Sequence, residues 1–368
     1  MNWNPAIAYN DLPLLPPHGF EETSKIFRQT TKSRVALESL HQAVNLIPNN
    51  EILIQTIPIL EAKSSSEIEN IVTTTDELFK YIDADENADS ATKEALRYRT
   101  ALWTGINSLR KCPLSVRTMT EVCSSLRNLN VTVRKNPGTY IGSSRTQSPI
   151  YTPPVGEDLI LNKLQNLSEF LHGEDPMDPL VKMAIAHYQF EAIHPFNDGN
   201  GRTGRVINIL YLVEQGLLDQ PVLYLSKYII ENKSEYYKAL LNVTRENAWE
   251  DWVLFMLRAV EDTATWTKDK VHAIVKLEQK TIDYIRSNSE LRKIYSRELV
   301  DAIFQRPYCR VSNLVDNDVV QRQTAMKYLK LMSEHGILTT LDMGREKLFI
   351  NHRLMHLLMS DSHSFEDF

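Results

Sequence analysis

Apolar residues recur at helical spacing along most of the chain, and each long segment carries a broad apolar face. This pattern predicts a mainly α-helical fold. The segment from Val206 to Val213 is apolar almost all round, so this helix should lie at the centre of the core. The expected helices cover residues 23–49, 74–84, 91–109, 118–129, 178–193, 206–213, 232–241, 248–265, 268–286, 296–304, 311–315 and 321–334.

Two segments carry the signals of strands instead. Residues 134–154 alternate β-branched and aromatic side chains around a polar turn, Ser143 to Gln147, which predicts a two-stranded hairpin. Residues 337–341 and 348–350 flank a second expected hairpin turn at 342–345. The chain is therefore expected to add small antiparallel hairpins to its helices.

Three other segments are less regular. Residues 1–20 are rich in proline and should form an extended arm lying on the body of the protein. Residues 224–230 are compatible with either a strand or a helix. The serine run at 64–66 stands before an amphipathic segment, and Ser66 and Glu69 have the spacing of a capping box, so the serines predict the start of a helix.

The stretch from His194 to Arg205, HPFNDGNGRTGR, joins two expected helices and concentrates the chemistry of the chain. Its glycines, Gly199, Gly201 and Gly204, let the backbone turn tightly and approach a bulky anion. The free N–H groups at the start of the second helix would point at that anion, and the helix dipole adds to the attraction. This composition is typical of a polyphosphate site.

The side chains of the same stretch fit that interpretation. Arg202 and Arg205 are three positions apart, so they can grip adjacent phosphates from the first helical turn. Asp198 is a hard oxygen ligand of the kind that Mg²⁺ takes in small number, with phosphates and water completing its shell. His194 titrates near neutrality and can act as a general base. A plain glycine-rich turn would explain any one of these residues, but not all of them within twelve positions.

The stretch resembles the signature of the Fic family, HPF-x-[DE]-G-N-G-R-x-x-R, and matches it at every defined position. The resemblance covers roughly residues 55–260. It implies an all-helical core with a small β-hairpin flap and, for most members, transfer of AMP from ATP to a hydroxyl of a target protein. It also implies that His194 is the catalytic base, that Asp198 holds Mg²⁺, and that the nucleotide is bound by Gly199, Asn200, Gly201, Arg202, Thr203, Gly204, Arg205 and Tyr236.

Two further segments resemble parts of the same family. Ser65, Glu69 and Asn70 match its inhibitory motif, [ST]-x-x-x-E-[GN], in which the glutamate pairs with the second arginine of the signature, here Arg205. The resemblance thus implies an enzyme that is inhibited by its own N-terminal helix, or one in which Glu69 positions a water and the same site also removes AMP. The predicted hairpin resembles the flap that clamps the target segment, with Ile150 and Tyr151 as the docking residues.

The last part of the chain looks separate. Three expected helices and a small hairpin resemble a winged-helix domain, whose third helix would offer Gln321, Arg322, Gln323, Lys327 and Lys330 for reading DNA. Winged helices also dock proteins, so both partners stay open. The expected domains are an N-terminal arm with helices at 1–110, a catalytic core at 111–266, a connecting helix at 267–290 and a winged-helix-like domain at 291–368.

Composition sets limits on this picture. The 368 residues are 42% hydrophobic and 24% charged, which allows two or three domains with a sizeable core. The net charge of −6 argues against a protein that is basic overall and coats nucleic acid. The three cysteines, Cys112, Cys123 and Cys309, lack metal-ligand spacing and fit a reducing compartment. Without a leader pattern or an apolar run of membrane length, the expectation is a cytoplasmic protein with no membrane partner.

Several alternatives to AMP transfer remain at this point. The enzyme could transfer phosphate or another nucleotide, although relatives with such chemistry depart from the consensus near Arg202 to Arg205. A DNA-binding regulator could use the nucleotide site only as a sensor, although a sensor needs no general base such as His194. A purely structural interaction protein is the third alternative. Expected partners are ATP and a protein substrate, which could be the chain itself. The sequence leaves open whether the protein is a monomer or a homodimer.

Overall fold

The computed structural model describes residues 3–47, 51–82, 85–142, 148–343 and 346–368, and within them the fold is mainly helical. The expected turns at 48–50, 143–147 and 344–345, and the expected helix end at Ala84, lie outside the described residues. The helices are α1 (Ser24–Asn45), α2 (Glu51–Ile68), α3 (Thr75–Tyr81), α4 (Ser90–Leu109), α5 (Val116–Arg127), α6 (Glu157–His172), α7 (Pro179–Ile193), α8 (Asn200–Glu214), α9 (Leu225–Glu231), α10 (Lys233–Glu246), α11 (Trp249–Ser287), α12 (Arg297–Gln305), α13 (Val311–Asp316), α14 (Arg322–Glu334) and α15 (His352–Met359). The strands are β1 (Ile141–Gly142), β2 (Pro149–Tyr151), β3 (Tyr308–Cys309), β4 (Thr339–Met343) and β5 (Glu346–Ile350).

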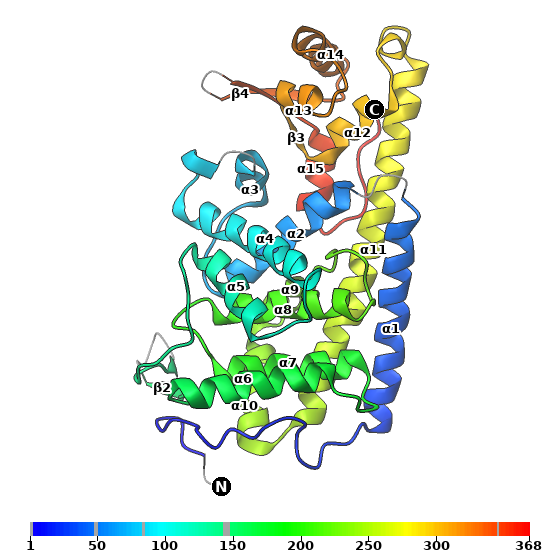
Figure 1. The fold of residues 1–368 in the computed structure, drawn as a ribbon. Helices are drawn as coiled ribbons and strands as arrows, with labels where there is room; N and C mark the ends of the chain where they lie inside the picture. Colours follow the sequence, from blue (N-terminus) through cyan, green and yellow to red (C-terminus); the bar gives the residue numbers. More distant parts are fainter. Residues whose placement is uncertain (1–2, 48–50, 83–84, 143–147, 344–345) are drawn as a thin grey trace.

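Helix α8 lies at the centre of the core, as its apolar sequence predicts. Its side chains from Val206 to Leu212 are all buried, and α2, α4, α5 and α7 pack around it (Figure 1). Gly105 of α4 permits a close approach to α8, because a Cβ added there would collide with the Leu210 side chain. Helix α8 is therefore enclosed by helices from several parts of the sequence.

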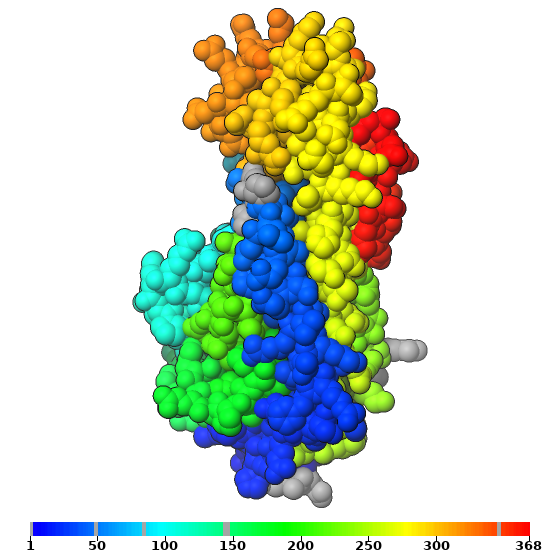
Figure 2. All heavy atoms as spheres, turned by 90° about the vertical axis from the view of Figure 1, so that its right-hand side faces the viewer, coloured from blue at the N-terminus to red at the C-terminus, as the bar shows by residue number. Residues whose placement is uncertain are grey.

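Helix α11 is one continuous element, and the predicted break between 265 and 268 is wrong. Trp266 and Thr267, the residues of this gap, both belong to the helix, and Thr267 is fully buried. Figure 1 shows α11 running the length of the molecule beside α1, and Figure 2 shows these two helices side by side at the surface. Helix α11 passes unbroken across the expected domain boundary at 266/267, so it marks no border there. The domain boundaries given above stay predictions.

The C-terminal residues fold as a winged helix. Helices α12, α13 and α14 stand beside an antiparallel sheet of order β3-β5-β4, in which Thr340 pairs with Phe349. The short strand β3 and the helix α15 were not predicted, and Asp342 and Met343, expected in a turn, belong to β4. This part contacts α3 directly, since the Tyr308 hydroxyl donates to Asp76 at 2.8 Å.

Other differences from the expected elements are local. The serine run is wrong as a helix start, since Ser64 to Ser66 lie inside α2, which begins at Glu51 and ends at Ile68. The apolar run before the serines forms the body of this helix, and Glu69 follows its end. Residues 224–230 belong mostly to α9, and α6 was not predicted. The predicted hairpin is confirmed as β1 and β2, with Ile141 opposite Tyr151. Within the described residues no helix has both the length and the apolar character needed to cross a bilayer.

Candidate functional site

The turn between α7 and α8 is held by its own side chains. His194 ends α7 in the left-handed conformation, with φ of 49°, and Gly199 begins α8 with φ of 85°. The Asn200 side chain, 2% exposed, accepts from the Phe196 N–H at 2.8 Å and donates to the Phe196 carbonyl at 2.7 Å. Asn200 therefore closes the turn with its side chain, and only its backbone is left to face a ligand.

Helix α8 opens with the free N–H groups that an anion needs. The N–H of Thr203 bonds back to the Gly199 carbonyl at 3.0 Å, so the N–H groups of the residues between them precede the regular ladder of the helix. The Thr203 hydroxyl also donates to the Gly199 carbonyl, at 2.7 Å, and is fully buried. Thr203 thus supports the turn from behind, whereas the first backbone N–H groups form the anion-facing surface.

Two glycines of the turn are required by close packing. A Cβ at Gly201 would collide with Oε1 of Glu69, and a Cβ at Gly204 would come within 2.7 Å of Oε1 of Glu191. Gly201 therefore admits an acidic group directly against the start of α8. Gly204 allows α7 and α8 to pack tightly beneath it.

Arg134, which precedes the hairpin, clamps the histidine turn from outside. Its Nε donates to the His194 carbonyl at 2.8 Å, and its backbone N–H donates to the Pro195 carbonyl at 2.9 Å. Burial, assisted by this nearby guanidinium, lowers the pKa of His194 from 6.5 to about 4. His194 is therefore neutral at pH 7, in the protonation state that accepts a proton.

Arg205 is occupied by the predicted inhibitory segment. Its Nη2 lies 2.9 Å from Oε1 of Glu69, its Nε donates to the Ser65 hydroxyl at 2.8 Å, and Nη2 also donates to the Ser65 carbonyl at 2.8 Å. Burial opposes ionisation of Glu69, but the Arg205 guanidinium outweighs it and lowers the pKa of that carboxyl. Asn70 follows with φ of 63° and accepts from Lys233 at 3.3 Å, so it ends the segment away from Arg205.

The other arginine of the turn is also paired. Nη2 of Arg202 donates to Oε1 of Glu94 on α4 at 2.7 Å. Nη1 of Arg127 on α5 lies 3.6 Å from the same Glu94 oxygen and 2.6 Å from Oδ2 of Asp198. The Asp198 side chain is 60% exposed, so this oxygen ligand faces a space open to solvent. Within the described residues no group of three or more His, Cys, Asp or Glu side chains could hold a metal, so a cation at Asp198 would take most of its ligands from elsewhere.

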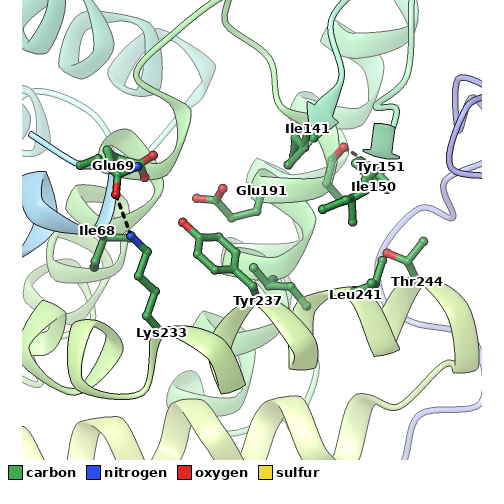
Figure 3. Close-up of a pocket in the computed structure, with 14 residues that line it drawn as sticks. Ile68, Glu69, Ile141, Ile150, Tyr151, Glu191, Lys233, Tyr237, Leu241 and Thr244 are labelled. Atoms are coloured by element: carbon green, nitrogen blue, oxygen red, sulfur yellow. Dashed lines mark hydrogen bonds between the residues drawn. The ribbon is translucent and has the colours of Figure 1, made fainter. Parts of the chain in front are cut away.

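Two cavities meet at Glu69. One, of about 380 Å³, lies over the turn and is lined by residues that include Glu94, Arg127, His194, Asp198 and Arg202. The other, of about 400 Å³, is mostly apolar and lies between α10 and the hairpin. Figure 3 shows this second cavity, with Glu69 at one end, Ile141 and Ile150 at the other, and Tyr237 and Glu191 between them. The carboxylate of Glu69 therefore stands between a polar space and an apolar one.

The aromatic wall of the apolar cavity is Tyr237, whereas the predicted residue Tyr236 lies in the core. Tyr236 is 1% exposed, its hydroxyl lies 2.8 Å from Nε2 of His187, and its ring packs among Trp252 and Phe255. Its neighbour Tyr237 is 43% exposed and lines the cavity. The two tyrosines are consecutive on α10, and helical geometry turns the first ring into the core.

The two predicted hairpin residues both line the cavity but differ in exposure. Ile150 is 41% exposed and lines the cavity. Tyr151 is 6% exposed, and its hydroxyl donates to the Ala192 carbonyl on α7 at 2.8 Å. Tyr151 therefore anchors the hairpin to the core, which leaves Ile150 as the residue of the pair that is available for docking.

Glu191 is an unpredicted acidic group in the site. It lies three positions before His194 on α7, and the figure shows its carboxylate beside Tyr237 in the cavity (Figure 3). Its Oε1 is buried without a hydrogen-bond partner among the described residues. Burial raises the pKa of Glu191 from 4.5 to about 7, against the opposing charge of Arg205.

Sequence reasoning placed the turn correctly but missed five residues around it: Glu94 and Arg127 from other helices, Arg134 from the loop before the hairpin, and Glu191 and Tyr237 in the apolar cavity. Glu191 and Tyr237 each lie close in sequence to a residue that was chosen, so proximity was a usable signal. Glu94 and Arg127 carry no local signal, because a charged residue on a long amphipathic helix is most often simply solvated.

Comparison with protein families divides the chain into three matched regions. Residues 27–107 match the model described as Fic/DOC family N-terminal, and residues 123–212 match the model of the Fic/DOC family. Residues 277–354 match the model described as Protein adenylyltransferase SoFic-like, C-terminal domain. The central match contains the whole turn from His194 to Arg205.

Individual proteins show similarity over shorter stretches. The chain is 37% identical over 89 residues to protein adenylyltransferase fic-1 of Caenorhabditis briggsae, which covers 24% of this chain and 16% of that one. It is 36% identical over 96 residues to a probable protein adenylyltransferase of Aquifex aeolicus, which covers 26% of this chain and 28% of that one. The chain thus spans less than a third of the length of these curated relatives.

Solved structures share the fold. A Fic family protein from Desulfovibrio desulfuricans aligns with a TM-score of 0.54 at 19% identity, over 90% of this chain and 97% of that one. Fic-1 from C. elegans aligns with a TM-score of 0.50 at 18% identity, over 69% of this chain and 74% of that one. With the three matched regions in chain order and the complete signature at the centre of the fold, the protein belongs to the Fic/DOC family.

Proposed function

We propose that this chain is a protein adenylyltransferase, which transfers AMP from ATP to a Ser, Thr or Tyr hydroxyl of a target protein and is inhibited by Glu69. One observation carries the proposal. The Glu69 carboxylate pairs with Arg205 at 2.9 Å where an apolar cavity meets the open start of a helix. That arrangement suits a nucleotide whose base enters the apolar side and whose phosphates replace the carboxylate.

The start of α8 would bind the triphosphate. Its first N–H groups and the paired arginines Arg202 and Arg205 supply fixed positive charge, which is worth more in a buried site than in water. Both guanidiniums are at most 2% exposed. Because a carboxylate and a phosphate compete for the same guanidinium, Glu69 would keep the γ-phosphate from its place as long as the pair lasts.

Asp198 would hold Mg²⁺. Its carboxylate is exposed, it lines the polar cavity, and it is already bound to a positive group, Arg127, at 2.6 Å, so the residues present fit a cation. When bound, Mg²⁺ would neutralise charge on the phosphates and on the leaving pyrophosphate. Asp198 itself would orient the phosphate chain relative to the start of α8.

His194 would serve as the general base. In the proposed reaction the target oxygen forms a bond to the α-phosphorus, the bond from that phosphorus to the pyrophosphate oxygen breaks, and the hydroxyl proton moves to the imidazole of His194. The neutral state of His194 at pH 7 suits this role. Arg134 would keep the imidazole in place by holding the backbone on both sides of the turn. Base catalysis of this kind contributes roughly 10²–10⁴-fold to a rate.

The base of the nucleotide would enter the apolar cavity beside Tyr237, and the hairpin would cover it. Strand β1 and the exposed Ile150 offer backbone and apolar contacts to an extended segment of the target. Such contacts read little sequence, which fits a target that the chain alone does not reveal.

Incubation with ATP labelled on the α-phosphate tests the proposal. The Glu69→Gly protein is expected to label itself or a protein in a lysate, with release of pyrophosphate, whereas the Glu69→Gly, His194→Ala double variant is expected to label nothing. Label from the γ-phosphate but not from the α-phosphate would instead indicate a phosphotransferase. Equal labelling by the double variant would remove His194 from its role.

DNA binding through the winged helix is a second candidate function. The five polar residues expected to read DNA are all exposed: Gln321 at the N-cap of α14, and Arg322, Gln323, Lys327 and Lys330 within the helix. The experiment is a gel shift with mixed DNA fragments at moderate salt. Binding that weakens on Arg322→Ala and Lys327→Ala substitution would support this function, and no shift by the wild type would reject it.

A further inference from the structure

Every charged group of the turn that would meet a nucleotide is matched by an opposite charge from outside the turn. Glu69 faces Arg205, Glu94 faces Arg202, and Arg127 faces Asp198. The first of these pairs belongs to the inhibitory segment. The other two come from α4 and α5, and the proposed function does not use them.

Arg127 stands between two carboxylates. Its Nη1 lies 2.6 Å from Oδ2 of Asp198 and 3.6 Å from Oε1 of Glu94, so one nitrogen faces both partners. A small movement of this guanidinium away from Asp198 would bring it into full contact with Glu94. The Arg127 side chain is 29% exposed, which leaves it room to move.

Glu94 accepts a hydrogen bond from only one of the three side-chain nitrogens of Arg202. Its Oε1 accepts from Nη2 of Arg202 at 2.7 Å, whereas Nε and Nη1 of Arg202 are buried with no hydrogen-bond partner among the described residues. Buried donors without acceptors are unfavourable, and a phosphate with several oxygens could satisfy more of them than Glu94 does. Arg202 is thus held by an acceptor that a better one can replace, provided that Glu94 finds another partner.

We propose that Arg127 and Glu94 are positioning residues that couple the cation to the phosphates: a cation at Asp198 displaces Arg127, Arg127 then pairs with Glu94, and Glu94 releases Arg202 to the nucleotide. This inference rests on the proposed function, because it presumes a metal-bound triphosphate at the turn. Without the cation, Arg127 stays on Asp198, and the phosphates must displace Glu94 while it has no new partner.

The coupling has a defined sign for each residue. Loss of the Glu94 charge removes the competitor of the phosphates, and this matters most when no cation is present. Loss of the Arg127 charge removes the new partner of Glu94, so the effect of Glu94 should then be the same with and without the cation. The effects of the two substitutions on the magnesium dependence of ATP affinity are therefore expected to be non-additive.

Equilibrium binding of ATP tests this coupling without turnover. The parent protein carries Glu69→Gly and His194→Ala, and its affinity for ATP is measured by calorimetry in excess EDTA and in saturating Mg²⁺. Glu94→Gln is expected to raise the affinity for metal-free ATP about tenfold and the affinity in Mg²⁺ less than about threefold. The reason is that a hydrogen bond to a charged group changes a binding constant by a factor on the order of ten. In an Arg127→Gln background the two factors should become equal.

Controls separate this inference from general effects of charge and stability. Arg117→Gln removes a positive charge from the same helix α5 at an exposed side chain that pairs with Glu121, and it should leave the magnesium dependence unchanged. Thermal unfolding checks each variant, and Glu94→Ala, which also removes the charge, should act in the same direction if Glu94→Gln does not fold. Two results would overturn the coupling but not the proposed function. One is that Glu94→Gln changes the affinity for ATP by the same factor in EDTA and in Mg²⁺. The other is that these two factors still differ in the Arg127→Gln background. A parent protein that binds no ATP in either condition would overturn the proposed function as well.

Discussion

The carboxylate of Glu69 lies 2.9 Å from Nη2 of Arg205, and this ion pair joins the end of α2 to the second turn of α8. Ser65 lies one turn earlier on α2 and is uncharged. Its hydroxyl and its carbonyl each accept a hydrogen bond from the same guanidinium, at 2.8 Å. The Arg205 donors are thereby directed at α2 and not at the polar cavity. Any phosphate that reaches Arg205 must first separate Glu69 from it.

Glu69→Gly should therefore raise AMP transfer. Loss of a charged hydrogen bond that competes with the γ-phosphate is expected to increase the rate at fixed ATP by about 10–100-fold. The matched control is Glu67→Gly, which introduces the same backbone freedom two residues earlier at a side chain paired with Lys63 at 3.0 Å. An unchanged rate in Glu69→Gly, or an equal gain in both variants, would contradict inhibition by Glu69. Incubation of AMP-modified protein with wild type and Glu69→Gly would show whether Glu69 also serves removal of AMP.

The acid limb of the rate profile should lie well below pH 6.5. Burial and Arg134 lower the pKa of His194 to about 4, so the free enzyme keeps its base unprotonated down to about pH 5. The same shift makes stability fall as pH drops from 6.5 towards 4, because the unfolded chain then binds the proton that the folded chain excludes. The measurement is kcat/KM against pH in the Glu69→Gly protein, with unfolding followed in parallel. A half-maximal rate near pH 6.5 would show that His194 titrates normally.

Glu191→Gln should stabilise the protein at alkaline pH but not at acid pH. Burial raises the pKa of Glu191 to about 7, so its contribution to stability is fully present below about pH 4.5 and is lost as pH rises through 7. A glutamine stays neutral at every pH, and the free energy of unfolding should exceed that of wild type by about 1–3 kcal/mol at pH 8. Urea unfolding at pH 5 and pH 8 measures the difference. The same difference at both pH values would be inconsistent with a buried, protonated Glu191.

Lys270→Met should loosen the C-terminal segment from α11. The Lys270 ammonium is fully buried and donates to the carbonyls of Leu357, Ser360 and Ser362 at 2.7, 2.8 and 2.8 Å. Loss of a charged donor to three carbonyls is expected to lower the free energy of unfolding by about 2–4 kcal/mol. Lys268→Met, at a partly exposed lysine two positions earlier, should change it by less than about 0.5 kcal/mol. Equal effects of the two substitutions would argue against this anchor.

The fold class was predictable because its signals are repeated along the chain. Helical spacing of apolar residues identified most of the helices, and the alternating segment around residue 141 was correctly expected as a hairpin. The errors occurred where burial overrode local preference. Thr267 fell in the gap between two expected helices, yet it is fully buried inside one continuous α11. The serine run was read as a helix start, although its side chains face the core from inside α2.

The sequence by itself determined the turn from His194 to Arg205, since its glycines, its helix start and its charged side chains are contiguous and act on one another locally. Tertiary structure alone decided what each charge faces. Glu94 and Arg127 reach the turn only because α4 and α5 pack against α8, and Tyr237 replaces Tyr236 at the cavity only because of how α10 is rotated against the core. Ion pairs and cavity walls depend on distances between helices, and those distances are set by packing around α8 and not by neighbours along the chain.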